Sequence, residues 1–243
     1  MRGIILAAGM GKRLRPHTDD VPKVLVPLGG GMTPLHLTLA NFQAVGIESC
    51  TLLAGYRADT LDVLRGPLAD RYSVGIDVVL NEKALEWNNS YSLLLALRSC
   101  QGEDALVVNG DTVHPASFQT SLLASPKDTL TIAVDSSFDL AEEEMKVLVE
   151  DGRVVQISKK LEPTSAYGEY VGLSWLPGAT HAELIRCLEA VVERDPQTYY
   201  EDGFQEYIDR GQTVGLVSTE GVAWTEIDDE ADLSRAKGIV CQY

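Results

Sequence analysis

The 243-residue sequence has few cysteines and no long hydrophobic run, and each shortage excludes a class of protein. Its four cysteines, Cys50, Cys100, Cys187 and Cys241, are too widely spaced for a Cys-x-x-Cys metal site. A chain of this length needs no disulfides to fold, so we expect reduced thiols in a cytoplasmic protein. No apolar stretch approaches the roughly 18 residues of a membrane span. The apolar start, Ile4–Ala8, runs at once into charged residues and does not fit a secretory signal.

Basic residues are also scarce, with 20 Lys and Arg against 36 Asp and Glu and a formal net charge of −16. A nucleic-acid-binding surface needs a basic face, so we expect no nucleic-acid partner. The positive charge that is present gathers near the N-terminus, at Lys12, Arg13, Arg15 and Lys23. An acidic protein with one basic region directs an anionic substrate to that region.

The pattern of short apolar runs alternating with helical segments predicts an α/β fold, with a mostly parallel sheet flanked by crossover helices. Hydrophobic residues make up 45% of the chain, which is enough for one large core. We therefore predict a single domain over residues 1–243. The expected strands are 3–8, 50–54, 76–80, 105–108, 130–134, 146–150, 154–158, 170–176, 213–217 and 222–227. The expected helices are 33–46, 59–72 with an interruption at Pro67, 179–194 and 199–210, with two more starting at 92 and 229.

The first predicted strand ends in a loop that contains Gly9, Gly11 and the cluster of basic residues. Glycines let backbone N–H groups approach a polyphosphate closely, and cations neutralise it. The loop is not a Walker A motif, because Arg13 stands where Ser or Thr is required, and Leu14 breaks the dinucleotide fingerprint. The alternative is a glycine turn with solvated basic residues. We predict that a triphosphate binds along Leu6, Ala7, Ala8, Gly9, Met10, Gly11 and Lys12.

Residues 6–18 fit the pattern L-A-A-G-x-G-x-R-[LM]-x-P-x-T, and P-K-x-L follows at 22–25. This motif resembles the signature of nucleotidyltransferases that couple a nucleoside triphosphate to a phosphorylated sugar or alcohol. The segment WNNSYSLLLAL at 87–97 is similar to cytidylyltransferases for choline phosphate and aminoethylphosphonate. Segments 144–147, 157–159, 168–172, 200–202 and 224–228 extend the resemblance over the chain. It implies a Rossmann-like nucleotide-diphospho-sugar transferase fold of the GT-A-like type.

The resemblance implies a site that cancels the charge of two reacting anions, since positioning and electrostatics dominate nucleotidyl transfer. We predict Lys23 near the α-phosphate and Arg13 on the departing β- and γ-phosphates. In the family, an acidic residue after a Leu-Val-Val-type strand and the Asp of an E-I-D motif hold the metal. Asp111 and Asp228 match these positions and predict a Mg²⁺ site. The alternatives are turn or helix-cap aspartates, with Asp229 as a rival metal ligand.

The remaining contacts are also carried over from the family. Ser92, at a helix start, is expected to contact the base with help from Asn88 or Asn89, although either Asn could simply cap the helix. A small acceptor with an amine calls for aromatic faces and carboxylates. The candidates for acceptor binding are Lys146, Lys159, Tyr170, Trp175, Tyr200, Glu201 and Asp202, with Tyr199 and Trp224 nearby; core packing and exposed hairpin lysines are the alternatives.

Together these features predict Mg²⁺-dependent transfer of CMP from CTP to a small phosphorylated or phosphonate head group, with release of pyrophosphate. The expected partners are CTP and this acceptor, and a homodimer is allowed. The first alternative is a sugar-1-phosphate nucleotidyltransferase that uses UTP, dTTP or GTP, since Asn109-Gly110-Asp111 also resembles the L-G-D of those enzymes. The second is a non-catalytic nucleotide-binding module.

Overall fold

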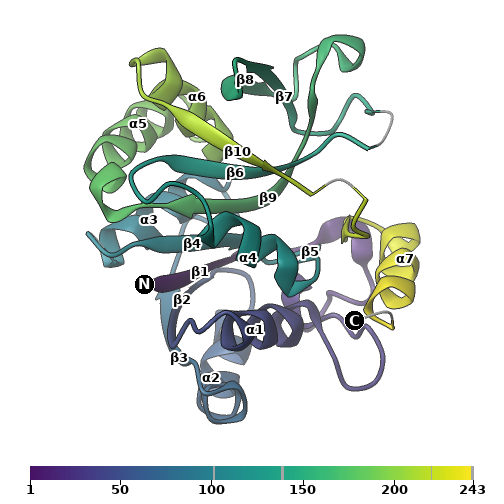
Figure 1. Cartoon of the computed structure of the whole chain (residues 1–243). Helices are drawn as coiled ribbons and strands as arrows, with labels where there is room; N and C mark the ends of the chain where they lie inside the picture. The colour runs from purple at the N-terminus through teal and green to yellow at the C-terminus, as the bar shows by residue number, and fades with distance from the viewer. Residues whose placement is uncertain (101, 138–139, 220, 242–243) are drawn as a thin grey trace.

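A mixed sheet of nine strands forms the centre of the protein, in the order β3-β2-β1-β4-β9-β6-β10-β8-β7 (Figure 1). The computed structural model describes residues 1–100, 102–137, 140–219 and 221–241. The strands are β1 Arg2–Ala7, β2 Ser49–Ala54, β3 Gly75–Leu80, β4 Ala105–Asn109, β6 Leu130–Asp135, β7 Lys146–Glu150, β8 Arg153–Ser158, β9 Gly168–Leu176 and β10 Val214–Ser218. The helices are α1 Pro34–Ala44, α2 Ala58–Tyr72, α3 Ser90–Ser99, α4 Ala116–Leu123, α5 His181–Arg194, α6 Tyr200–Asp209 and α7 Glu230–Val240.

Strand direction brings one set of strand ends to a common edge. β3, β2, β1 and β4 are mutually parallel, and β10 is parallel to β6. β9 is antiparallel to both β4 and β6, and β8 is antiparallel to β10 and β7. Within this nine-stranded sheet, β8 and β9 are therefore antiparallel to the other seven strands. As a result, the first residues of β9 lie beside the last residues of β6, at the edge where the parallel strands end.

Helices cover both faces of the sheet because the strand side chains alternate between two apolar clusters. Ile4 of β1 packs with Leu93 of α3 and Leu188 of α5 on one face. Its neighbour Ile5 packs with Phe42 of α1 and Phe118 of α4 on the other. The result is a three-layer α/β architecture with the sheet in the middle.

A third, smaller cluster fixes the N-terminal loop against the C-terminal helix. Leu14 and Val26 of the loop pack with Val113, Ile227 and Leu233. Figure 1 shows the loop after β1, in purple, next to α7, in yellow. A short antiparallel pair, β5 Thr112–Val113 and β11 Thr225–Glu226, joins the same region. Three parts of the chain that are far apart in sequence thus meet at the carboxyl edge of the sheet.

The structure confirms the predicted α/β fold class and most elements within a few residues. Two details differ. The predicted strand 222–227 shrinks to the two residues of β11. Helix α2 continues through Pro67, because the carbonyl that loses its hydrogen-bond donor belongs to Val63, a residue that is 76% exposed and can bind water instead. Among the described helices, none is long and apolar enough to cross a membrane.

Candidate functional site

The loop after β1 is held in one conformation by glycine and by a buried threonine. Gly11 has φ +63°, and its carbonyl accepts a hydrogen bond of 2.9 Å from Oγ1 of Thr18. A Cβ at Gly11 would lie 3.2 Å from Thr18 and 3.3 Å from Lys23, so a side chain there would be strained and crowded. Gly9 faces open space. The loop cavity, about 370 Å³, is bounded by Gly9, Met10, Gly11, Lys12, Arg13, Lys23, Ala84, Leu85, Asp111 and Asp228.

Lys23 joins two carboxylates from distant parts of the chain. Its Nζ lies 2.6 Å from Oδ2 of Asp111 and 2.8 Å from Oδ1 of Asp228. Backbone contacts fix both partners: the N–H of Gly110 donates to the Leu6 carbonyl at 2.9 Å, and the N–H of Ile227 donates to the Asp111 carbonyl at 3.0 Å. The two predicted metal ligands therefore lie together, at the ends of β4 and β11.

The charges at this point are strongly coupled. Burial alone would lower the pKa of Lys23, but Asp111 and Asp228 outweigh it and raise the pKa. Burial would raise the pKa of Asp228, but Lys23 and Arg13 lower it. Arg13 lies 2.7 Å from Oδ2 of Asp228. Lys23, Arg13, Asp111 and Asp228 therefore form one network of ion pairs.

Glu226 adds a third carboxylate that the sequence reasoning missed. One oxygen from each of Asp111, Glu226 and Asp228 lies within 4.8 Å of the others. Burial, followed by the charge of Asp111, raises the pKa of Glu226 well above its usual value. Three converging carboxylates are the hard oxygen donors that Mg²⁺ prefers, so the residues fit such an ion. The signal was present, because Glu226 belongs to the W-T-E-I-D segment at 224–228. Asp229 instead caps α7 by accepting from the N–H groups of Ala231 and Asp232.

The helix cavity, about 230 Å³, opens beside the start of α3. Its wall consists of Leu6, Ala8, Gly9, Ala84, Trp87, Asn88, Asn89, Ser92, Asn109, Asp111 and Glu226. Ser92 Oγ accepts a hydrogen bond of 2.9 Å from Asn81 Nδ2. Asn88 donates to the Gln197 carbonyl at 3.1 Å, and Asn89 Oδ1 accepts from the N–H of Tyr200 at 3.0 Å. The two asparagines thus tie α3 to the segment before α6. Ala7 is buried in the core and is not part of this wall.

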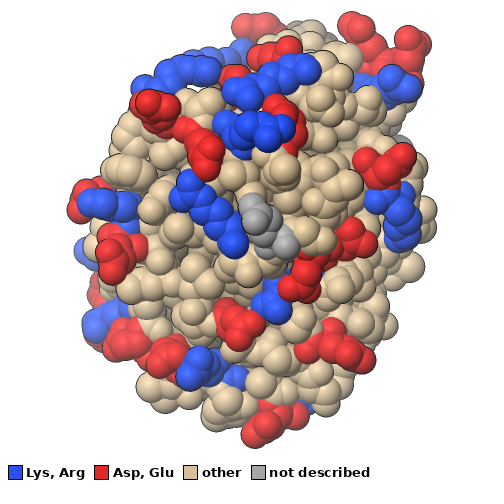
Figure 2. All heavy atoms as spheres, turned by 90° about the vertical axis from the view of Figure 1, so that its left-hand side faces the viewer, with Lys and Arg blue, Asp and Glu red and all other residues tan. Residues whose placement is uncertain are grey.

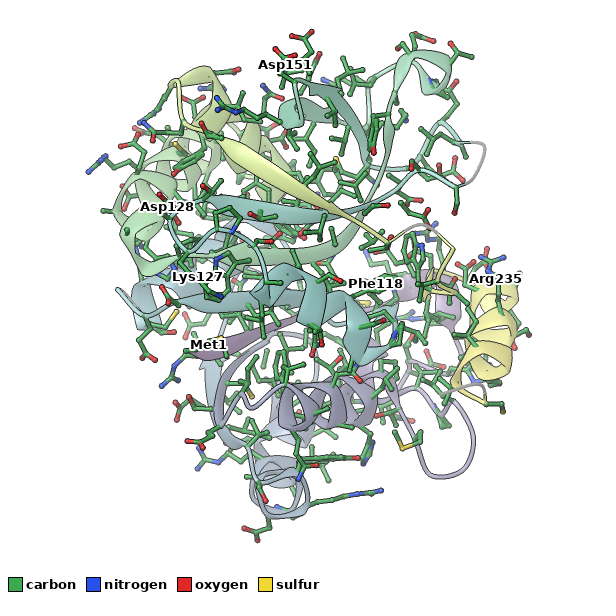
Figure 3. The ribbon with its side chains drawn as sticks, viewed as in Figure 1. Met1, Phe118, Lys127, Asp128, Asp151 and Arg235 are labelled. Carbon is green, nitrogen blue, oxygen red and sulfur yellow. The ribbon has the colours of Figure 1, made fainter. Side chains whose placement is uncertain are left out.

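The acidic cavity, about 590 Å³, lies between β9, α6 and the start of α7. Of the predicted acceptor residues, Lys159, Tyr170 and Glu201 line it, together with Tyr199 and Trp224. Arg13, Asn89, Asn109, Glu143, Glu144, Met145, Glu169, Gly172, Thr225, Glu226, Asp228, Asp232 and Arg235 complete the wall. Figure 3 shows Arg235 on α7, well away from Asp151 at the tip of the β7–β8 hairpin. Glu169 and Asn109 were missed because their strand-end positions look like ordinary sheet residues.

Four predicted acceptor residues must be corrected, because none of them lines the acidic cavity. Trp175 is 1% exposed and packs in the core between β4 and β6, since a central strand buries both faces. The fully buried Lys146 donates its ammonium to the carbonyls of Ala141, Glu142 and Glu144. Two residues of α6 are also structural: Tyr200 is fully buried and donates to Oδ1 of Asn109 at 2.9 Å, and Asp202 accepts from the N–H of Tyr199 at 2.8 Å.

The three cavities meet at a charged cluster that consists of Arg13, Lys23, Asp111, Glu226 and Asp228. The loop and helix cavities share Asp111, the loop and acidic cavities share Arg13 and Asp228, and the helix and acidic cavities share Glu226. A ligand that occupied all three would therefore pass directly over the carboxylates. On the face shown in Figure 2, by contrast, acidic and basic side chains are interspersed, without a large area of either sign.

Comparisons with known proteins find similar nucleotidyltransferases. Choline-phosphate cytidylyltransferase of Streptococcus pneumoniae is 38% identical over 96 residues, which cover 39% of this chain and 38% of that protein. The CMP-5'-(3-aminopropyl)phosphonate synthase of Streptomyces rubellomurinus is 26% identical, over 97% of this chain and 38% of its own. The matched regions thus cover well under half the length of both relatives. The structure of the inositol-1-phosphate CTP transferase from T. maritima superposes with a TM-score of 0.81 at 27% identity, covering 98% and 95% of the two chains.

The predicted resemblance to nucleotidyltransferases is therefore confirmed. Residues 3–195 match the family described as the MobA-like NTP transferase domain, and this match includes the N-terminal loop, Lys23 and Asp111. The chain belongs to the MobA-like NTP transferase family.

Proposed function

We propose that the protein transfers CMP from CTP to a small acceptor that carries a phosphate or phosphonate, with release of pyrophosphate. The observation that carries the proposal is the meeting of three cavities at Lys23, Asp111, Glu226 and Asp228. One cavity for a base, one for a triphosphate and one for an acceptor is the arrangement that nucleotidyl transfer requires. The choice of cytidine is supported by two of the relatives, a cytidylyltransferase and a CMP-phosphonate synthase.

In this proposal the base occupies the helix cavity beside Ser92 and Asn89. The triphosphate lies along the loop from Gly9 to Lys12, where the backbone N–H groups and the side chains of Arg13 and Lys23 face it. The acceptor occupies the acidic cavity. This order places the α-phosphorus at the junction of the cavities, next to the ammonium of Lys23.

The reaction is an in-line displacement. An anionic oxygen of the acceptor forms a bond to the α-phosphorus, and the bond from that phosphorus to the bridging oxygen of the β-phosphate breaks, so that pyrophosphate leaves with the electron pair. The acceptor oxygen is already ionised, and no general base is needed. Lys23 neutralises charge on the α-phosphate and Arg13 neutralises it on the leaving group, which lowers the barrier through fixed electrostatics.

Asp111, Glu226 and Asp228 would hold a Mg²⁺ ion, as their donor chemistry indicates. When bound, such an ion supplies positive charge to phosphate oxygens and helps to align them. Lys23 bonds two of these carboxylates, Asp111 and Asp228, and would fix their orientation.

The experiment is a pyrophosphate-release assay with Mg²⁺. It crosses CTP, UTP, dTTP, GTP and ATP with choline phosphate, ethanolamine phosphate, 2-aminoethylphosphonate, inositol 1-phosphate and glucose 1-phosphate. We expect release with CTP and a small head group. Release with UTP, dTTP or GTP and glucose 1-phosphate alone would contradict the proposal and identify a sugar-1-phosphate enzyme. Tight CTP binding without turnover across the panel would favour a binding module.

A further inference from the structure

The acidic cavity is lined by more acidic than basic side chains, although the proposed acceptor is itself an anion. Seven carboxylates line it, against three cationic side chains. The carboxylates are Glu143, Glu144, Glu169, Glu201, Glu226, Asp228 and Asp232, and the cations are Arg13, Lys159 and Arg235. The question is which carboxylates already have partners within the protein.

Most of the carboxylates near α7 and the β7 loop are already bonded. Asp228 pairs with Lys23 and Arg13. Asp232 pairs with Arg235 and also accepts from the backbone N–H of Asp228. Glu144 accepts from the N–H of Ala141 at 2.6 Å. These groups shape the cavity without needing a ligand.

Glu201 is different. It is 5% exposed, and its Oε2 is buried without a hydrogen-bond partner. Across the described part of the chain it forms no ion pair within 4 Å, although the charge of Lys159 acts on it. Burial raises the pKa of its carboxyl to about 7. A buried carboxylate oxygen without a partner is costly, so this oxygen, on a residue that lines the cavity, points to a ligand that donates to it.

Glu169 faces the same cavity from β9. No ion pair to its side chain occurs within the described residues, and burial together with Glu144 and Asp135 raises its pKa to about 8. A hydrogen bond links the neighbours of the two glutamates: Tyr170, next to Glu169 on β9, and Tyr200, next to Glu201 on α6, have hydroxyl groups 2.9 Å apart. Glu201 and Glu169 thus line the cavity without an ion pair within the described residues; the same holds for Glu143, which is exposed, and for Glu226, which belongs to the three-carboxylate cluster.

The aromatic side chains of the cavity are poorly arranged for a quaternary ammonium, which binds over free ring faces. Nζ of Lys159 already lies 4.8 Å from the centroid of the Tyr199 ring. The Tyr170 ring packs edge-to-face with Tyr200 and Phe204, at centroid distances of 6.2 and 6.3 Å. Trp224 is the remaining aromatic residue of the cavity wall that could offer a ring face to a quaternary ammonium. One indole face does not form a cage.

Resting on the proposed function, we propose that the acceptor carries a primary ammonium group and that Glu201 and Glu169 are the residues that select it by accepting its N–H hydrogen bonds. The phosphate or phosphonate of the same molecule then points toward Arg13 and Lys23. The acceptor class is therefore an amino-alkyl phosphate or phosphonate, in preference to a quaternary ammonium or a polyol phosphate.

The test compares three acceptors that differ only at the head: ethanolamine phosphate, choline phosphate and 2-hydroxyethyl phosphate. We expect kcat/KM to be highest for ethanolamine phosphate, by about tenfold or more over the other two. In Glu201→Gln, kcat/KM for ethanolamine phosphate should fall about ten- to hundredfold while that for 2-hydroxyethyl phosphate changes little. The preference for the amine should therefore shrink, and Glu169→Gln should act in the same direction.

Glu150→Gln is the matched control, because Glu150 is exposed on the hairpin outside the cavity. It should leave the acceptor preference and the KM for CTP unchanged. Choline phosphate or 2-hydroxyethyl phosphate used as well as the amine would overturn the inference. So would Glu201→Gln and Glu169→Gln variants that keep the wild-type preference.

A separate measurement distinguishes this inference from the proposed function. If no acceptor supports pyrophosphate release, the proposed function fails, and binding of the three acceptors is measured by calorimetry. Tighter binding of ethanolamine phosphate than of 2-hydroxyethyl phosphate, lost in Glu201→Gln, would still support the ammonium site. Equal binding of the two, or binding of neither, would overturn it.

Discussion

The side-chain ammonium of Lys23 lies 2.6 Å from Oδ2 of Asp111, although 88 positions separate the two residues in sequence. Asp228, a further 117 positions along, contacts the same nitrogen at 2.8 Å. The charged cluster therefore depends on the complete fold, because the small apolar cluster around Leu14, Val26 and Ile227 brings the three segments together. Predictions about catalysis, metal binding and stability follow from these contacts.

Removal of the Lys23 charge should abolish most of the activity. In Lys23→Met the side chain keeps most of its length but cannot neutralise the α-phosphate, so kcat should fall about 100- to 1000-fold. Steady-state pyrophosphate release measures this. Lys160→Met, at an exposed lysine next to the β7–β8 hairpin, is the control and should retain full activity. A Lys23→Met enzyme with wild-type kcat would remove Lys23 from the mechanism.

Glu226 should matter as much for metal binding as Asp111. In Glu226→Gln one anionic donor of the three-carboxylate cluster is lost, so the Mg²⁺ concentration for half-maximal activity should rise roughly tenfold or more. A Mg²⁺ titration of activity measures the change. Asp229→Asn is the control, because Asn also caps helices well and the α7 cap should survive. If Asp229→Asn shifts the titration and Glu226→Gln does not, Asp229 is the ligand instead.

Lys146 should act through the loop that forms one wall of the acidic cavity. Lys146→Met leaves the carbonyls of Ala141, Glu142 and Glu144 without their shared donor. We expect a loss of about 1–3 kcal/mol in the free energy of unfolding and a higher KM for the acceptor. The KM for CTP should change little. Denaturant unfolding and acceptor kinetics measure these effects, and unchanged values for both would show that the lysine does not order the loop.

The buried carboxyl of Glu201 should make stability depend on pH in a defined direction. Burial raises its pKa to about 7 from an unfolded value of about 4.3. Between these values the folded state binds more protons than the unfolded state, so its contribution to stability falls as pH rises through that window and levels off above about 7. Glu201→Gln removes the ionisation and should be more stable than wild type at pH 8.

The control for this effect is the comparison at pH 5, where Glu201 is protonated in the folded protein and the two proteins should melt at similar temperatures. Glu169 acts in the same direction, because its pKa is raised to about 8. A difference in melting temperature between wild type and Glu201→Gln that is constant from pH 5 to pH 8 would contradict the assignment.

Sequence alone predicted the parts of the site that depend on local chemistry. The glycines of the N-terminal loop and the cations beside them have few uses other than phosphate binding. Asp111 and Asp228 follow apolar strand patterns, and strand ends in such a sheet converge. These residues could therefore be placed before any coordinates were known.

The parts that failed depend on contacts between segments. Trp175 looked available for acceptor binding because a strand can leave one of its faces open. β9, however, is a central strand, and both of its faces are covered. Lys146 looked exposed because lysines usually are, and the three carbonyls that bind it come from an irregular loop without a sequence pattern. Glu226 was passed over because it lies on a strand of two residues that only the pairing with β5 creates.

The most direct test of the central claim follows the α-phosphate. CTP labelled at the α-phosphorus in one sample and at the γ-phosphorus in another is incubated with ethanolamine phosphate and Mg²⁺, and the products are separated. The account predicts that the α-label appears in a CMP–acceptor conjugate and the γ-label in pyrophosphate, with neither conversion in Lys23→Met. Recovery of the α-label in CDP with the γ-label on the acceptor, or in free CMP without a conjugate, would contradict it.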